Sequence, residues 1–294
     1  MNKLLITGGS GFVGQNLAEF FAPLCTVVTT YLSHPHASLD SNAHTVRLDV
    51  RDADETLDVV ERISPDVLIH AAGNKDVRFC EEHPGEAYRV NAEGARNVAR
   101  ACRRVGARMV YLSTDLVFAG VEGNYKEGDD ARPASVYGKS KLEGERLALE
   151  ESGGEAAVCR SGGIYGRRSP LLSWLAAELG AGRVVECFVD VFNTPTYAEN
   201  LAEMLEAVIA KRLTGVFHTA GRERVSRFDF FRSYARAFGL DLRLLSPASR
   251  EGRAAGALLQ PDASLSTEQT SDALGVKFDS VDEGFARLKA RGGV

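Results

Sequence analysis

"LLITGGSGFVGQNL", residues 4–17, is an apolar run that passes through glycines at positions 8, 9, 11 and 14 and then resumes as a second apolar run. The spacing Gly9-x-Gly11-x-x-Gly14 is typical of the turn between a strand and a helix that binds a dinucleotide. Such a turn gathers free backbone N–H groups and the positive helix end at one point, where a pyrophosphate is stabilised. The stretch therefore predicts a cofactor-binding loop, and a glycine turn without a ligand is the alternative.

Size and composition place the chain among ordinary folded proteins. It has 294 residues, of which 44% are hydrophobic and 26% charged, and a formal net charge of -5. The arginines are scattered among acidic residues, so they form no basic patch that would bind nucleic acid or an anionic membrane. No apolar run approaches the roughly 18 residues of a membrane span. We therefore expect a cytoplasmic protein with no nucleic acid or membrane partner. Five cysteines without CxxC spacing indicate neither a disulfide framework nor a zinc site, so no metal is expected.

Strand-like and helix-like segments alternate along the N-terminal half. Strands are predicted at 3–7, 25–30, 45–48, 66–70, 108–113, 156–160 and 215–220. Helices are predicted at 12–21, 54–63, 86–105, 135–151 with Ser135 as N-cap, and 197–212. Strands that are apolar at successive positions and separated by helices indicate a parallel sheet buried on both faces. The predicted fold class is α/β, a Rossmann-like doubly wound parallel sheet.

Two lobes are expected. Residues 1–165, with a returning segment at 193–220, form the dinucleotide-binding domain. Beyond residue 165 the alternation loosens into shorter helices with Gly and Pro turns. We interpret 166–192 and 221–294 as a smaller, mixed substrate lobe.

The residues after the second strand bear on the choice between NADP and NAD. Thr29 to Leu39 contains neither an acid for the adenosine ribose nor a base for a 2'-phosphate, and its polar candidates are Ser33, His34, His36 and Ser38. The cofactor is therefore NADP or NAD, with a slight lean to NADP. The two histidines without a third ligand are more typical of a surface loop than of a metal site.

Tyr137 and Lys141 stand four residues apart on the predicted helix after the fifth strand, and that strand ends in Ser113 and Thr114. Reduction of a carbonyl needs a hydride, a proton for the oxygen and a fixed dipole to hold that oxygen. We expect the Lys141 ammonium to lower the pKa of the Tyr137 phenol, Tyr137 to donate the proton and Thr114 to bind the carbonyl oxygen. A tyrosine packed on the sheet beside a solvated lysine is the alternative.

Gly138 and Gly144 are unusual inside the same helix, since each costs about 1 kcal/mol against alanine. Their presence indicates that another group approaches the helix backbone closely.

Several motifs occur in an order that resembles one known family: TGGSGFVG (7–14), LDV (48–50), HAAG (70–73), VNAEGARN (90–97), STDLVF (113–118), YGKSKLEGE (137–145) and NTPTYAENLA (193–202). The loop spacing Gly8-x-x-Gly11-x-x-Gly14 also fits. Together they resemble the extended short-chain dehydrogenase/reductase family, in particular its dTDP-4-dehydrorhamnose reductase branch. The resemblance implies three catalytic residues, Thr114, Tyr137 and Lys141. It implies a substrate contact from Asn91, Thr114 and Asp115. It implies a cofactor groove made of Thr7, Gly8, Gly11, Phe12, Val13, Gly14, Asp49, Val50, Ala71, Ala72, Gly73, Ser113, Tyr137 and Lys141.

Two departures from related patterns bear on the reaction and the substrate. Dehydratases of this superfamily carry an Asp-Glu pair after the threonine, whereas Asp115 is followed here by Leu116, which argues against dehydration. The rhamnose branch has a sugar-stacking tryptophan where this chain has Gly163. Another keto-sugar nucleotide thus becomes a plausible substrate.

The leading hypothesis is an NAD(P)-dependent oxidoreductase that reduces a keto group on a nucleotide-activated deoxy sugar, with a homodimer as one expectation for its assembly. A non-catalytic regulatory subunit resembling the beta subunit of methionine adenosyltransferase is an alternative, as is a sugar nucleotide epimerase that retains NAD. Surface-lobe arginines are candidates for pairing with a substrate diphosphate: Arg167, Arg168, Arg222, Arg224 and Arg227.

Overall fold

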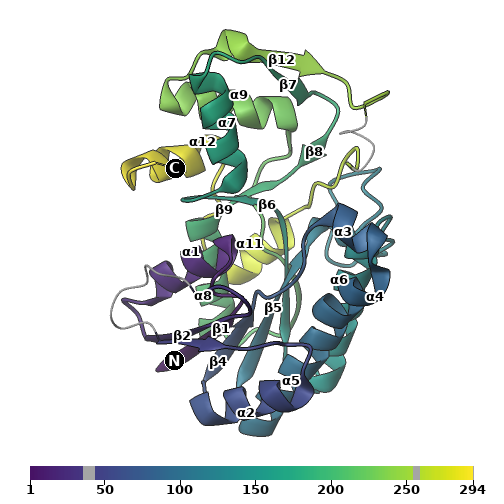
Figure 1. The fold of residues 1–294 in the computed structure, drawn as a ribbon, viewed down its shortest axis with the longest axis vertical. Helices are drawn as coiled ribbons and strands as arrows, with labels where there is room; N and C mark the ends of the chain where they lie inside the picture. The colour runs from purple at the N-terminus through teal and green to yellow at the C-terminus, as the bar shows by residue number, and fades with distance from the viewer. Residues whose placement is uncertain (36–43, 254–258, 294) are drawn as a thin grey trace.

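A parallel sheet forms the centre of the molecule in a computed structural model that describes residues 1–35, 44–253 and 259–293 (Figure 1). Within these residues its strands run in the order β10 (Gly215–His218), β6 (Ala157–Tyr165), β5 (Arg108–Thr114), β4 (Val67–His70), β1 (Lys3–Thr7), β2 (Thr26–Tyr31) and β3 (His44–Arg47), and β9 (Pro195–Tyr197) pairs with β6. Strand order 3-2-1-4-5-6 with all pairs parallel is the doubly wound arrangement, so the predicted fold class is confirmed.

Helices cover both faces of this sheet, which explains why its strands are apolar at successive positions. One face packs on α1 (Phe12–Phe21), α8 (Ala198–Ala210) and α11 (Glu268–Leu274). The other packs on α2 (Ala53–Ile63), α5 (Gly94–Val105) and α6 (Val136–Glu151). Alternate residues of β1 therefore serve two cores, with Leu4 and Ile6 facing the first set and Leu5 the second.

A second lobe lies beyond the carboxyl ends of the strands, at the top of Figure 1. It contains α7 (Pro170–Gly180), β7 (Val185–Phe188), β8 (Phe192–Asn193), β11 (Val225–Ser226), α9 (Arg227–Phe238), a 3-10 turn (Leu242–Leu244), β12 (Leu245–Ala248) and α12 (Val281–Ala290). Its own aromatic core joins Tyr165, Phe230 and Phe285. The segment around α11 differs from the predicted lobe boundary: Leu274 and Phe278 pack in the sheet core with Leu201 because α11 lies against α8.

The helix predicted at 86–105 is interrupted. The chain instead forms α3 (Val77–Glu82), α4 (Pro84–Tyr88), one π-helical turn (Arg89–Glu93) and then α5. π-turns widen a helix locally and re-aim the side chains on it. Here the turn carries Asn91, one of the predicted site residues.

The helix of the Tyr-Lys pair begins as predicted. Ser135 is the N-cap of α6 and its side chain accepts a hydrogen bond from the Gly138 backbone N–H. The preceding strand ends at Thr114 and continues into a 3-10 turn (Asp115–Val117), so both motifs meet at the carboxyl edge of the sheet. Among the helices of the described residues, none is long and apolar enough to cross a membrane.

Candidate active site and cofactor groove

The glycine loop between β1 and α1 fits a bound pyrophosphate. Gly8 has φ +69°, and a Cβ there would lie 2.8 Å from the Ala72 backbone; a Cβ on Gly14 would lie 2.3 Å from the Gly8 carbonyl oxygen. Gly11 is the N-cap of α1, so no side chain caps this helix start, and its first turn carries no acid. The N–H groups of Phe12 and Val13 are thus placed to meet an anion. This geometry suits the diphosphate of NAD(P).

The side chain of Thr7 faces the interior rather than the groove. Its hydroxyl lies 2.7 Å from His70 Nδ1 and accepts from the Ala72 N–H at 3.4 Å. Burial lowers the pKa of His70 to about 3, and the Lys141 charge adds to this, so His70 is neutral. In the structure the Thr7 hydroxyl supports the loop after β4, and its cofactor contact stays a prediction.

Ala71 to Gly73 follow β4 directly beside the glycine loop, as the resemblance implies, and all three are at least partly accessible. Asp49 is partly accessible too, but Arg51 binds it through two nitrogens at 2.8 and 2.6 Å and lowers its pKa. The Val50 side chain packs on Gly94, and the Val50 carbonyl oxygen accepts a hydrogen bond from Asn97. The contact of Val50 with adenine stays a prediction.

Of the candidates for the adenosine ribose, Ser33 and His34 are exposed and contact each other at 3.0 Å. His36 and Ser38 lie outside the described residues. No cluster of three or more metal-ligating side chains occurs among the residues that the structure describes.

Thr114, Asp115 and Tyr137 meet at the carboxyl edge of β5. Thr114 Oγ1 donates to Asp115 Oδ1 at 3.0 Å, and the nearby Thr114 hydroxyl lowers the pKa of the Tyr137 phenol. Both Thr114 and Asp115 are buried and Tyr137 is half-buried. Sequence reasoning thus placed two predicted catalytic groups that the fold brings together.

Lys141 lies one turn after Tyr137 on the same face of α6 and is buried. Its Nζ donates to the Leu112 carbonyl oxygen at 2.7 Å and stands 4.1 Å from the centroid of the Tyr111 ring. A solvated lysine, the alternative considered from sequence, is therefore excluded by its burial.

The expected electrostatics of this pair are wrong in one respect. Burial raises the pKa of Tyr137 well above its usual value, and the Asp115 charge adds to that shift. Burial also lowers the pKa of Lys141 to about 7. The pKa of the phenol therefore does not come near neutrality here, because burial is the largest cause of its shift. Tyr137 stays protonated at neutral pH, which suits a proton donor.

Protein groups, not a ligand, explain the helix glycines. A Cβ on Gly138 would lie 2.1 Å from the Leu116 carbonyl oxygen, and one on Gly144 would lie 2.3 Å from the Tyr111 hydroxyl. The prediction of a close approach is confirmed, with the strand and its following turn as the approaching groups.

Asn91 is buried, and protein groups occupy its side-chain amide. It is 1% exposed, its Oδ1 accepts from the Asn74 N–H, and its Nδ2 donates to the Asn74 carbonyl and to Ser140 Oγ. Its amide links the loop after β4 to α6, and its substrate contact stays a prediction.

Two buried charges were missed by sequence reasoning. Glu145 accepts from Ser113 Oγ at 2.5 Å and from Arg160 at 2.9 and 2.7 Å. The Ser113 hydroxyl, a predicted cofactor contact, thus points inward instead. The signal was available, since Glu145 follows Lys141 by four residues and Arg160 interrupts an apolar strand.

Asn193 was also missed. It lies beside Gly163, where an added Cβ would meet its Nδ2 at 2.6 Å, and the neighbouring Gly162 faces Asp115 Oδ2. Four of the five arginines predicted to pair with a substrate diphosphate form ion pairs with acidic side chains of the protein: Arg167 and Arg168 with Glu19, Arg222 with Glu283, and Arg224 with Asp262. Arg227 stacks near the Phe231 ring at 5.3 Å, and burial lowers its pKa.

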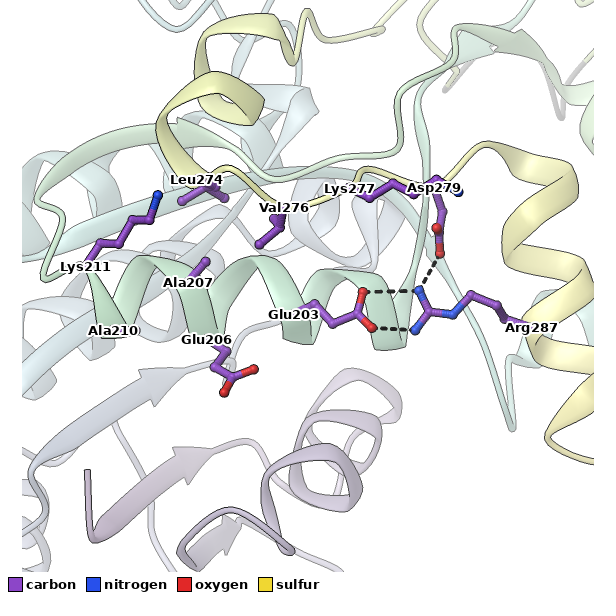
Figure 2. A pocket seen from close by; sticks show the side chains of 10 residues that line it. All are labelled: Glu203, Glu206, Ala207, Ala210, Lys211, Leu274, Val276, Lys277, Asp279 and Arg287. Carbon is purple, nitrogen blue, oxygen red and sulfur yellow. Dashed lines mark hydrogen bonds and ion pairs between the residues drawn. The ribbon is translucent and has the colours of Figure 1, made fainter.

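A cavity of about 640 Å³ between α8 and the segment after α11 is separate from the candidate active site (Figure 2). Figure 2 shows the Arg287 guanidinium between Glu203 and Asp279, at 2.6 and 2.7 Å. Arg287 is neutralised there by these two carboxylates, and none of the predicted site residues lines the cavity.

The buried acid and the buried lysine predict a stability minimum near neutral pH. Asp115 has its pKa raised by burial from 3.8 to about 7, so the stability it contributes below pH 3.8 is lost as pH rises through about 7. Burial lowers the pKa of Lys141 from 10.5 to about 7, so the stability that Lys141 contributes above pH 10.5 is lost as the pH falls through about 7.

Asp115→Asn tests the acidic half of this prediction. As the pH rises from 4 to 7, the free energy of unfolding of the variant should increase relative to that of the parent protein by on the order of a few kcal/mol. The reason is that the amide stays neutral, whereas the buried carboxyl ionises. A pH-independent difference between the two proteins would contradict it.

Comparison with known proteins agrees with this geometry. The family model described as RmlD substrate binding domain matches residues 1–291. The dTDP-4-dehydrorhamnose reductase of Aggregatibacter actinomycetemcomitans is 31% identical over 238 residues, 78% of this chain and 77% of that protein. Methionine adenosyltransferase 2 subunit beta of Bos taurus is 27% identical over 262 residues, 83% of this chain and 75% of that protein. The crystal structure of dTDP-4-dehydrorhamnose reductase from Bacillus anthracis in complex with NADP has a TM-score of 0.85 and 26% identity, and the match covers 99% of this chain and 100% of that one.

Proposed function

Because the chain belongs to the RmlD substrate binding domain family, within the extended short-chain dehydrogenases/reductases, we propose that it is an NAD(P)-dependent oxidoreductase reducing a keto group on a nucleotide-activated deoxy sugar. The observation that carries the proposal is the meeting of Thr114, Tyr137 and Lys141 at the sheet edge that also presents the glycine loop. We also propose a cytoplasmic protein that acts without nucleic acid. Its assembly as a homodimer stays a prediction, which sedimentation analysis would check.

The chain's own residues supply the proton and the dipoles. When bound, the nicotinamide supplies the hydride for the keto carbon. Tyr137, protonated at neutral pH, donates its phenolic proton to the keto oxygen as charge develops there. Lys141, whose pKa burial lowers to about 7, places a partly charged group one helical turn away.

Asp115 determines where the Thr114 proton points. That hydroxyl has one proton, and in the structure Asp115 accepts it. A keto oxygen also only accepts, so Thr114 can donate to it once Asp115 is protonated and becomes the donor to Thr114. Burial raises the Asp115 pKa to about 7, which keeps that form accessible near neutrality.

Asn193 is our candidate for a substrate contact in the second lobe. Its amide lies beside Gly163 and close to Thr194, whose carbonyl faces Gly162 next to Asp115. In the part of the chain that the structure describes, no protein group hydrogen-bonds this amide. It is therefore suited to a sugar hydroxyl or a diphosphate oxygen, in a space that a large side chain at 163 would occupy.

Asn193→Ala should raise KM for the sugar nucleotide about 5- to 10-fold, as expected for one lost hydrogen bond, and leave KM for NADPH unchanged. Steady-state kinetics with each substrate varied in turn measure both. An equal change in both constants would point to a general distortion and contradict the assignment.

The proposed function is tested by NADPH and NADH oxidation with a panel of dTDP-, UDP- and GDP-linked 4-keto sugars. Turnover with at least one panel member is the expected result. No oxidation with any of them, together with co-purification of an adenosyltransferase, would instead support the regulatory alternative. Tightly retained NAD with sugar interconversion would support the epimerase.

A further inference from the structure

From the buried network behind the candidate site, we infer that Glu145 is a positioning residue whose carboxylate holds the positive charge on Lys141 and directs the Ser113 hydroxyl inward. The inference rests on the proposed function, because it specifies how that site keeps its lysine charged. It concerns a residue that makes no contact with the groove itself: Glu145 is 3% exposed and all its partners are protein groups.

The helix places three chemically active side chains on one face. Tyr137, Lys141 and Glu145 follow one another at intervals of four residues on α6, so each lies one turn from the next. The row runs from half-buried Tyr137 into the interior, ending at Glu145. A charge at Glu145 is therefore within reach of Lys141 through a medium of low polarity, where Coulomb interactions are strong.

Lys141 has no direct counter-ion. Its bonded partner is the neutral Leu112 carbonyl, its ring partner is Tyr111, and among the described residues no carboxylate lies within 4.0 Å of its Nζ. Burial alone would favour the neutral amine. Burial lowers the pKa of Lys141 to about 7, and the Glu145 carboxylate opposes that shift.

Arg160 keeps Glu145 from pairing directly with the lysine. The guanidinium binds Glu145 through Nε and Nη2 at 2.9 and 2.7 Å and stacks 5.0 Å from the Phe118 ring centroid. Ser113 occupies Oε1 as well. With both carboxylate oxygens engaged, Lys141 points at β5, where it meets the Leu112 carbonyl and the Tyr111 ring, instead of folding back along the helix.

The other titratable groups around Lys141 do not supply this charge. From β4 it faces His70, which is neutral, and from β5 it faces Tyr111, whose pKa burial raises. Tyr137, one turn away on its own helix, stays protonated. Asp115 carries a negative charge only above about pH 7. Glu145 is thus the carboxylate that acts on Lys141 through the neutral range.

Glu145→Gln tests the inference, because glutamine keeps the size and an acceptor but removes the charge. The alkaline limb of kcat/KM for NADPH oxidation should move down by about one pH unit, since Lys141 then loses its proton more easily. Arg160→Lys, which keeps the cation, is the matched variant and should leave that limb where it is. An unmoved limb in folded Glu145→Gln protein would overturn the inference.

A second readout needs neither cofactor nor substrate. Stability measured by denaturant unfolding should begin to rise with pH near pH 7 in the parent protein, and about one pH unit lower in Glu145→Gln, because the lysine is neutral from a lower pH. Identical onsets would overturn the inference even if no keto sugar is ever turned over. If the single variant does not fold, the same onset is measured in Glu145→Gln/Arg160→Met, from which both charges are absent.

Discussion

Tyr137→Phe should lower turnover of the keto-sugar nucleotide by a factor on the order of 10² or more while leaving NADPH affinity nearly unchanged. The phenol lies next to Thr114 at this edge, and burial keeps it protonated at neutral pH. Removing its oxygen deletes the proton donor without opening a cavity, since the ring remains. Single-turnover kinetics and NADPH fluorescence titration separate the two effects.

The control for this prediction is Tyr165→Phe, in which a buried phenol in the second lobe loses its bond to the Val281 carbonyl. That variant should lose about 1 kcal/mol of stability and keep its turnover. Near-normal turnover in Tyr137→Phe would remove the phenol from the mechanism. A parallel loss in both variants would show that turnover depends on lobe packing instead.

Local patterns were sufficient to predict the sheet. Strand β1 and helix α1 occur at the residues that their apolar runs indicate, and Ser135 caps α6, because each of these signals depends only on neighbours along the chain. The boundary of the second lobe could not be predicted from local patterns. Leu274 and Phe278 return to the sheet core through a contact with Leu201, about 70 residues earlier, and no periodicity reports such a contact.

The candidate site divides in the same way. Tyr137, Lys141 and Thr114 were found because their spacing and strand-end position are local features, whereas the direction of each hydroxyl is set by distant partners. Ser113 turns toward Glu145 and Thr7 toward His70, so protein partners engage both hydroxyls that were expected to meet the cofactor. The phenol pKa was misjudged because burial is a property of the folded molecule.

The second prediction with a large expected effect concerns the buried ion pair between Arg160 and Glu145. Arg160→Met should destabilise the protein by about 3–5 kcal/mol, because it leaves the Glu145 carboxylate in the interior with Ser113 as its remaining donor. Denaturant unfolding at fixed pH measures the change. Arg100→Met is the matched control: its ion pair with Glu151 is open to solvent, and water replaces the lost partner there, so little change is expected.

The double variant Glu145→Gln/Arg160→Met separates the two possible causes of that loss. If the cost of Arg160→Met is the unpaired buried carboxylate, neutralising Glu145 should recover most of the lost stability, since a neutral amide is far cheaper to bury than an ion. If the cost is lost packing of the guanidinium on Phe118, the double variant should be as unstable as the single one. The coupling between the two substitutions, taken from the full cycle, therefore measures how strongly this pair depends on mutual neutralisation.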